Sequence, residues 1–433
     1  MRVLFVSGEL IAGDLAYKLQ KEGCDVKLYI EDKSRKDCFG GMVRKTESWK
    51  KELKWVGKNG LIVFDDVGYG QIQDDLRSKG YLVVGGSQGG DKLEKERNYC
   101  QKIFYVCGID PIETHDFRNV DSAIDFLNEK DNKKAWVLKQ NGHHSIFNYV
   151  GEMDDGSDIL SLLKSYKEHL KINVPLTLQK RVRGIEIGIA RYFNGNDWVG
   201  PIEFNIEHKQ LCNDCVGPMT GEMGTVIWYD NNEKNKLFRK TLAKLKPFLK
   251  RANFKGDFDI NCIINKNRVY PIEATSRFGC PSTQLQDELN CSPWKEFLLA
   301  VAKGEPYNLR HKKGYGVIVS LAIPPFPSKV NDSFYIKGTE IKFKKRVTKS
   351  ELDKIHFEEV SLEKDGKKKR LHIAGNNGYI AYVSATGQTV REACQKVYAL
   401  VNKVVIPRVF YRTDIGEKFY KKDKKTLKAW GWI

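Results

Sequence analysis

The sequence of 433 residues contains no run of 18 or more apolar residues, so we expect no transmembrane helix and no membrane partner. The opening segment, MRVLFVSGELIAGDLAYKLQKEG, has a single arginine and a short apolar run before acidic residues and a helical pattern follow. This pattern differs from that of a secretion signal and predicts a first strand and helix. We therefore expect a cytoplasmic protein.

The sequence also lacks a disulfide framework. Its ten cysteines are scattered, and in a cytosolic chain of this size they are most simply free thiols. Cys212 and Cys215 form a CxxC pair, but no nearby pair supplies the two further ligands that a structural zinc ion needs. Two loop cysteines are therefore favoured over a metal or redox site.

Acidic residues are fewer than basic ones. The sequence contains 73 lysines and arginines and 55 acidic residues, which gives a formal net charge of +18. Lysines cluster in the last third, at KKRVTK, KDGKKKR and KKDKKTLK. Such an excess attracts polyanions, whether nucleic acid, nucleotides or phosphorylated substrates, although solvated surface lysines are the simpler interpretation. No nucleic-acid-binding motif accompanies the basic residues, so charge alone does not indicate a DNA-binding protein.

A dinucleotide-binding fingerprint is missing too, because the first turn, GELIAG, does not fit GxGxxG. Residues 1–90 instead alternate short apolar strands with amphipathic segments, which predicts a parallel sheet with helices on both faces. Further on, AWVLKQNG predicts a strand ending at Lys139, and GDFDINCIINKNRVYPIEATSRFG predicts two strands joined by the turn NKN. Residues from about 312 onward predict another α+β unit. The whole is an α/β and α+β multidomain fold.

Oxygen-bearing side chains gather on this predicted hairpin. Asp257, Asp259 and Asn261 lie on one face of the first strand, and Glu273 closes the second strand twelve residues after Asn261. Oxygen ligands on neighbouring strands suit a Mg²⁺ ion that bridges nucleotide phosphates. Solvated acids at a sheet edge would give the same pattern, so both interpretations stay open.

Three further features are compatible with an anionic ligand. Lys139, at the end of an apolar strand, can reach a phosphate, although it could equally be a solvated lysine. Glu186 follows a glycine turn, where a carboxylate could bind ribose hydroxyls. Three glycines between 217 and 224 expose backbone N–H groups that can cradle an anion, or they form a flexible loop.

Taken together, these segments resemble the ATP-grasp ligases, and within them the glycinamide ribonucleotide synthetase (phosphoribosylamine–glycine ligase) family. The segments HKQLCNDCVGPMTGEMG and PIEATSRFGCPSTQ are similar to that family's HK…GPNTGGMG and EFNxRFGDPETQ signatures. The segments DDLRSKGYLVVGGSQGGDKLEKERNYC and GNNGYIAYVSATGQTVREACQKVYALVNKV also follow the family in spacing. The resemblance covers roughly residues 70–418, and residues 1–65 match only in their βαβ pattern.

The resemblance implies an N-terminal α/β substrate domain (1–100), an ATP-grasp domain of two lobes (101–311, small lobe about 112–180) and a C-terminal α+β domain with a basic tail (312–433). It implies that ATP phosphorylates a carboxylate, glycine in the family, and that the amine of phosphoribosylamine then attacks the acyl phosphate. Mg²⁺ or Mn²⁺ would neutralise phosphate charge. The substrates would be small molecules, and the protein a monomer or homodimer active in purine biosynthesis.

The resemblance also assigns roles to single residues. As catalytic residues it implies Arg277 and Glu273. As ATP-binding residues it implies Lys139, Gln179, Lys180, Arg181, Val182, Glu186 and Lys102. As substrate-binding residues it implies Asp66, Lys209, Asp214, Gly217, Pro218, Thr220 and Gly221. As metal ligands, together with the hairpin pattern above, it implies Glu273, Asn261, Asp259 and Thr275.

Several contact positions depart from the family. Thr275 replaces the asparagine that follows the metal-binding glutamate, and FGDPE has become FGCPS. The glycine-rich lid is GHHSIFN, in which His143 and His144 are either phosphate donors or exposed loop residues. Two alternatives therefore stand beside glycinamide ribonucleotide formation. One is a ligase that joins an amino acid to another amine, such as a modified nucleotide or nucleic acid. The other is a non-catalytic nucleotide-binding protein.

Overall fold

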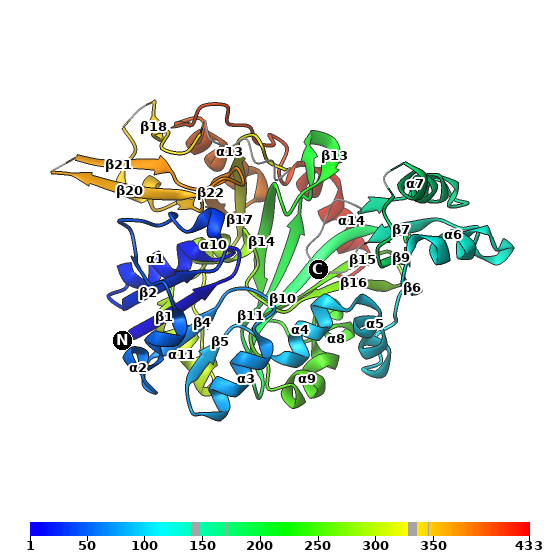
Figure 1. The fold of residues 1–433 in the computed structure, drawn as a ribbon, viewed down its shortest axis with the longest axis horizontal. Helices are drawn as coiled ribbons and strands as arrows, with labels where there is room; N and C mark the ends of the chain where they lie inside the picture. The colour runs from blue at the N-terminus through cyan, green and yellow to red at the C-terminus, as the bar shows by residue number, and fades with distance from the viewer. Residues whose placement is uncertain (140–147, 170, 328–335, 345, 367) are drawn as a thin grey trace.

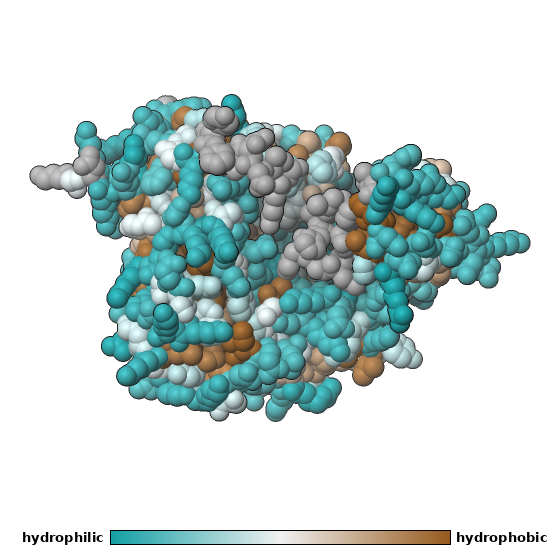
Figure 2. Space-filling view, in the orientation of Figure 1, coloured by the Kyte–Doolittle hydropathy of each residue, from teal (hydrophilic) through white to brown (hydrophobic). Residues whose placement is uncertain are grey.

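The computed structural model describes residues 1–139, 148–169, 171–327, 336–344, 346–366 and 368–433 (Figure 1). Three sheets of four or more strands organise this part of the chain, and Figure 1 shows the eight-stranded sheet in the middle, between the five-stranded and four-stranded sheets. Hydrophilic residues cover most of the face shown in Figure 2. In the described residues we find no helix with the length and apolar character needed to cross a membrane.

The N-terminal sheet is parallel, as the βαβ pattern predicts. Its strand order is β3-β2-β1-β4-β5. The strands are β1 (Arg2–Ser7), β2 (Asp25–Ile30), β3 (Arg44–Lys45), β4 (Leu61–Phe64) and β5 (Leu82–Val84). The helices are α1 (Gly13–Lys21), α2 (Leu53–Val56), α3 (Gly70–Ser78), α4 (Gln88–Lys95) and α5 (Arg97–Val106). Alternate residues of β1 pack into two different cores, Phe5 in one and Leu4 in the other, because both faces of the sheet are covered.

The four-stranded sheet has the order β6-β9-β7-β8 and its own apolar core, with Trp136, Leu138 and Leu163 fully or almost fully buried. Its strands are β6 (Thr114–Phe117), β7 (Trp136–Lys139), β8 (Tyr149–Val150) and β9 (Leu176–Lys180), and its helices are α6 (Val120–Asn128) and α7 (Ser157–Glu168). This separate core makes it a distinct lobe, which lies at one end of the molecule in Figure 1. We call it the small lobe.

The eight-stranded sheet has the order β16-β15-β10-β11-β14-β17-β22-β19. Its strands are β10 (Ile185–Asn194), β11 (Trp198–Glu207), β14 (Gly224–Asp230), β15 (Lys255–Ile264), β16 (Val269–Thr275), β17 (Tyr315–Ala322), β19 (Ile355–Phe357) and β22 (Tyr379–Gly387). Strand β14 pairs with β17, so a single sheet runs across the boundary that the sequence predicts near residue 312. Backbone hydrogen bonds therefore join the predicted large ATP-grasp lobe to the predicted C-terminal domain.

Seven further α-helices and three two-stranded sheets belong to the described chain. The helices are α8 (Lys236–Lys240), α9 (Leu242–Arg251), α10 (Ser282–Leu289), α11 (Trp294–Lys303), α12 (Lys349–Leu352), α13 (Val390–Val401) and α14 (Lys424–Ala429). The paired strands are β12 (Gln210–Cys212) with β13 (Val216–Met219), β18 (Lys342–Phe343) with β23 (Val404–Val405), and β20 (Val360–Asp365) with β21 (Lys368–Ile373). All ten cysteines are free thiols, and the Cys212–Cys215 pair is exposed.

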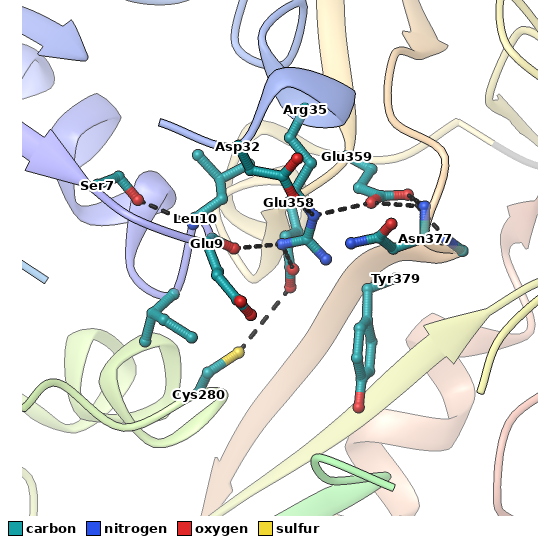
Figure 3. Close-up of polar contacts among 12 residues, drawn as sticks. Ser7, Glu9, Leu10, Asp32, Arg35, Cys280, Glu358, Glu359, Asn377 and Tyr379 are labelled. Carbon is teal, nitrogen blue, oxygen red and sulfur yellow. Dashed lines mark hydrogen bonds and ion pairs between the residues drawn. The ribbon is translucent and has the colours of Figure 1, made fainter. Parts of the chain in front are cut away.

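A buried ion-pair cluster ties the N-terminal sheet to the C-terminal part of the chain (Figure 3). The guanidinium of Arg35 lies 2.7 Å from Oε1 of Glu358 and 3.0 Å from Oε1 of Glu359, and it donates to the carbonyl of Glu9. All three side chains are at least nine-tenths buried. Because buried charges need partners, this cluster fixes the relative position of the two segments.

Candidate active site

A cavity of about 530 Å³ separates the small lobe from the eight-stranded sheet, and we call it the interlobe cavity. Most residues predicted to bind ATP line it. These are Lys139, Gln179, Lys180, Arg181, Val182 and Glu186. Lys209, Thr220, Gly221 and Glu273, from the predicted substrate and metal sets, line it as well. Residues more than 130 positions apart in the chain thus meet around one space.

The small lobe contributes a lysine and a polar strand end to this cavity. Lys139 is the last residue of β7, and burial together with the nearby charge of Arg97 lowers the pKa of its ammonium to about 8. Gln179, on the neighbouring strand β9, is buried and donates to Thr114 Oγ1 and to the carbonyl of Ile272. This second bond reaches β16 of the large sheet and helps fix the small lobe above it.

Lys209 lines the interlobe cavity and lies close to three carboxylates. Its Nζ atom lies 3.2 Å from Glu186 Oε1, 3.1 Å from Glu207 Oε2 and 3.0 Å from Glu273 Oε1. Burial works to lower the pKa of Lys209, but the carboxylates of Glu207, Glu273 and Glu186 outweigh it and raise the pKa well above its usual range. Thr220 folds back over this lysine, with both its N–H and its hydroxyl donating to the Lys209 carbonyl at 2.7 Å.

Glu273 also bonds to an arginine that the sequence patterns do not single out. Nη1 of Arg97, in α5, lies 3.1 Å from Glu273 Oε2. The charges of Lys209, then Lys139 and Arg97, hold the pKa of Glu273 well below its usual range. The carboxylate is therefore ionised at neutral pH, as a metal ligand must be. The sequence signal for Arg97 is weak, because it lies in a helix next to several other charged residues.

The four predicted metal ligands lie side by side on the hairpin β15–β16, whose NKN turn is also as predicted. Asn261 is paired in register with Glu273, and Asp259 with Thr275. Oδ1 of Asp259 and Oδ1 of Asn261 are buried and have no hydrogen-bond partner, so both could accept a cation. This set of oxygen donors fits Mg²⁺ or Mn²⁺. Across the described chain, no group of three or more His, Cys, Asp or Glu side chains is arranged to hold a metal, so the set depends on its amide and hydroxyl oxygens as well.

Arg277 follows β16 directly and is held by an acid from the N-terminal part. Its Nε donates to Glu94 Oε1 at 2.9 Å and lies 3.8 Å from Asp66 Oδ1. Burial works to lower the pKa of Arg277, but Glu94 and Asp66 outweigh it and raise the pKa, so the side chain stays charged. Asp66 belongs to the wall of another cavity, of about 670 Å³, which we call the outer cavity. Arg277 thus links the large sheet to the predicted substrate domain.

Other predicted residues lie away from the interlobe cavity as the described residues define it. Lys102 is exposed on α5. Asp214, Gly217 and Pro218 are exposed on the β12–β13 hairpin, where the N–H of Asp214 donates to Asp414. His143 and His144 of the predicted lid lie outside the described residues. The roles proposed for these residues therefore stay predictions.

No family model matches the chain. In sequence it is 24% identical over 358 residues to phosphoribosylamine–glycine ligase from Clostridium acetobutylicum, covering 80% of this chain and 81% of that protein. In structure it is similar to phosphoribosylamine–glycine ligase from Thermotoga maritima, with a TM-score of 0.71 and 22% identity, covering 96% and 100% of the two chains.

A third similarity is to the biotin carboxylase domain of 2-oxoglutarate carboxylase from Hydrogenobacter thermophilus, solved with MgADP and bicarbonate. The TM-score is 0.63 at 12% identity, over 94% of this chain and 91% of that one. The fold is therefore that of the ATP-grasp enzymes, as the sequence predicts. Within that class, the chain resembles phosphoribosylamine–glycine ligase in both sequence and structure, as a divergent relative.

Proposed function

We propose that this chain is an ATP-dependent ligase that joins a carboxylate to an amine, with glycine and phosphoribosylamine as substrates and glycinamide ribonucleotide as product. The observation that carries the proposal is the convergence of Lys139, Glu186, Lys209 and Glu273 on one interlobe cavity, with Arg277 in the wall of a smaller cavity that adjoins it. The names of the relatives point to the same reaction.

The proposed reaction has two steps. A carboxylate oxygen of glycine takes the γ-phosphoryl group of ATP, which forms an acyl phosphate and releases ADP. The amine nitrogen of phosphoribosylamine then attacks the carbonyl carbon, the C–O bond to phosphate breaks, and the nitrogen loses a proton as phosphate leaves. No covalent bond to the protein is needed.

The side chains act in this scheme mainly by position and charge. Lys139 neutralises phosphate oxygens, Arg277 stabilises the transferring phosphoryl group, and Lys209 contributes to substrate binding. Glu186 accepts hydrogen bonds from the ribose hydroxyls, and residues 179–182 contact the adenine. Glu273, Asn261, Asp259 and Thr275 would hold Mg²⁺ or Mn²⁺, which supplies charge neutralisation to the phosphates when bound.

The test is ADP release by the purified protein with Mg·ATP, glycine and freshly prepared phosphoribosylamine, omitting each in turn. We expect release only when all three are present, together with formation of the amide. ATP binding without ADP release would contradict the proposal and leave two alternatives, a ligase with another amine acceptor and a non-catalytic nucleotide-binding protein.

One observation favours a second candidate, a ligase with a different amine acceptor. The outer cavity beside Asp66 is also lined by Glu9, Glu31 and Asp32, an acidic environment that is more typical of a cation site than of a phosphate site. Amide formation with glycine and a non-phosphorylated amine, but not with phosphoribosylamine, would support it. A nucleic-acid acceptor stays a prediction from the basic lysine clusters, to be tested by the salt dependence of oligonucleotide binding. The oligomeric state also stays a prediction.

A further inference from the structure

A third cavity, of about 140 Å³, adjoins the interlobe cavity and shares Lys209, Gly221 and Glu273 with it. Its remaining lining is strongly acidic, and we call it the acidic cavity. The acids beyond Glu273 are Glu203, Glu207, Glu222, Asp257 and Asp259. The proposed reaction gives no role to Glu203, Glu222 or Asp257.

The acidic cavity extends along the sheet in rows. Asn261 and Glu273 form the row next to the proposed phosphate site, Asp259 and Thr275 form the next, and Asp257 lies one row deeper on β15. Successive residues on one face of a strand are about 6.6 Å apart, so the deepest acid lies on the order of 13 Å along the strand from Asn261.

Small residues on the intervening strand leave room for these side chains. Strand β10 runs between β15 and β11, and opposite Asn261 and Asp259 it carries Gly188 and Ala190. A Cβ atom on Gly188 would come within 1.9 Å of Asn205 Oδ1, so a larger residue there would displace the Asn205 side chain. Glu203, paired with Ala190, therefore faces the same space as Asp259.

In Glu203, Asp257 and Asp259, only one of the two carboxylate oxygens accepts a hydrogen bond. Gln286 Nε2 donates to Glu203 Oε2 at 2.9 Å and to Asp257 Oδ2 at 3.1 Å, and Asn205 Nδ2 donates to Asp259 Oδ2 at 2.6 Å. The second oxygen of each carboxylate is buried without a partner.

Glu222 is the clearest case. The residue is only 5% exposed in the wall of the acidic cavity, and its Oε1 atom is buried with no hydrogen-bond partner among the described residues. A buried carboxylate with no partner is costly, so such a group points to a bound ligand.

The cationic side chains that line the acidic cavity form ion pairs with other acids. Lys209 pairs with Glu186, Glu207 and Glu273, and Arg277 pairs with Glu94. Within the described chain, no lysine, arginine or histidine forms an ion pair with Glu203, Glu222, Asp257 or Asp259. Only Asp259 of these four acids belongs to the proposed metal-binding set, so Glu203, Glu222 and Asp257 remain for an organic cation.

We propose that the acidic cavity binds the side-chain ammonium group of an amino-acid substrate, so that a diamino acid serves as carboxylate donor in addition to glycine. The proposal rests on the proposed ligase function. The donor's carboxylate would lie at the row of Glu273, near Lys209 and Arg277, and a methylene chain would carry the ammonium to Glu222 and the acids one row deeper. The cavity is about ten times the roughly 10–15 Å³ that one water needs by the same measure, which leaves space for such a chain.

The test compares ornithine with norvaline, which has the same number of side-chain carbons and no side-chain ammonium group. Equilibrium binding to the full chain is measured by calorimetry, with glycine as a third ligand. We expect ornithine to bind at least about tenfold more tightly than norvaline, which corresponds to about 1.4 kcal/mol. Equal affinities for the two would overturn the proposal without any mutation.

Two isosteric variants locate the ammonium. We expect Glu222→Gln and Glu203→Gln each to reduce the affinity for ornithine by about tenfold and to leave the weak norvaline binding as it is, whereas Glu392→Gln, on the surface of α13, serves as control. Unchanged ornithine binding in both variants would place the ammonium elsewhere. Binding is measured without turnover, so the two proposals can fail separately. Selective binding of ornithine by a protein that releases no ADP would contradict the ligase function and support the ammonium-binding site. ADP release with glycine but no selectivity for ornithine would support the ligase function and contradict the ammonium-binding site.

Discussion

The Nζ atom of Lys209 lies 3.0 Å from the Oε1 atom of Glu273, and the other oxygen of the same carboxylate lies 3.1 Å from Arg97. Two cations therefore hold this carboxylate ionised and aimed at the interlobe cavity. Lys209 comes from the segment after β11, Glu273 from β16 and Arg97 from α5, so the arrangement depends on three separate parts of the chain.

Replacing Glu273 with glutamine should abolish turnover while the fold is kept. Glutamine has the same shape, but it cannot compensate Lys209 and Arg97 and is a poorer ligand for a divalent cation. We expect ADP release to fall about 100-fold or more, equivalent to about 2.7 kcal/mol of activation free energy. Glu392→Gln, which alters a partly exposed carboxylate on α13, is the matched control. Full activity of the Glu273 variant would remove this residue from the active site.

Replacing Lys139 with alanine should weaken nucleotide binding about 10- to 100-fold. This is the effect expected from the loss of one hydrogen bond to a charged group, which contributes about 1.5–3 kcal/mol. The measurement is the affinity for Mg·ATP by calorimetry. Lys164→Ala removes an exposed lysine from α7 of the same lobe and should bind ATP as the wild type does. Equal affinity of the Lys139 variant and the control would show that Lys139 does not contact the nucleotide.

The pH dependence of ATP affinity should report the same lysine. Because the pKa of Lys139 is lowered to about 8, its ammonium loses a proton as pH rises through that value. The protonated form binds phosphate better, so affinity should be flat between about pH 6.5 and 7.5 and fall above about pH 8. In Lys139→Ala this fall should disappear, and its persistence would assign it to another group.

Replacing Arg35 with methionine should destabilise the protein by about 3–5 kcal/mol, because Glu358 and Glu359 would remain buried without their cation. The expected result is a lower midpoint of denaturation, measured by circular dichroism. Lys396→Ala breaks an exposed pair on α13 and should leave the midpoint nearly unchanged. Equal midpoints for the two variants would contradict the structural role of the cluster shown in Figure 3.

His356 should make stability depend on pH near neutrality. Its Nδ1 atom lies 2.8 Å from Asp14 Oδ2. Burial works to lower the pKa of His356, but the hydrogen bond and the charge of Asp14 outweigh burial. The pKa in the folded state is therefore raised above the unfolded value of about 6.5. Because the pKa is raised, the His356–Asp14 pair contributes fully to the free energy of unfolding below about pH 6.5. That contribution is lost as pH rises through the folded-state pKa. Thermal unfolding between about pH 6 and 9 should show this loss in the wild type and not in His356→Gln.

Much of the architecture follows from local pattern. The apolar alternation of residues 1–90 predicts the parallel sheet, and GDFDINCIINKNRVYPIEATSRFG predicts the hairpin that pairs Asn261 with Glu273. Strand periodicity places alternate side chains on one face whatever the tertiary context, so Asp257, Asp259 and Asn261 can be grouped from their spacing alone. The polar residues of β11 show the same alternation, at Glu203, Asn205 and Glu207, and this spacing is the signal that could have indicated the acidic cavity.

The partners of these side chains were decided by tertiary structure alone. Nothing in the spacing of Arg97, Lys209 and Glu273 indicates that they meet, since α5, the segment after β11 and β16 come together only when the sheets pack. The same holds for the eight-stranded sheet, in which β14 pairs with β17 about 90 residues away. Periodicity depends on the geometry of one strand, whereas charge compensation and pKa values depend on which side chains the folded chain brings within a few ångströms of one another.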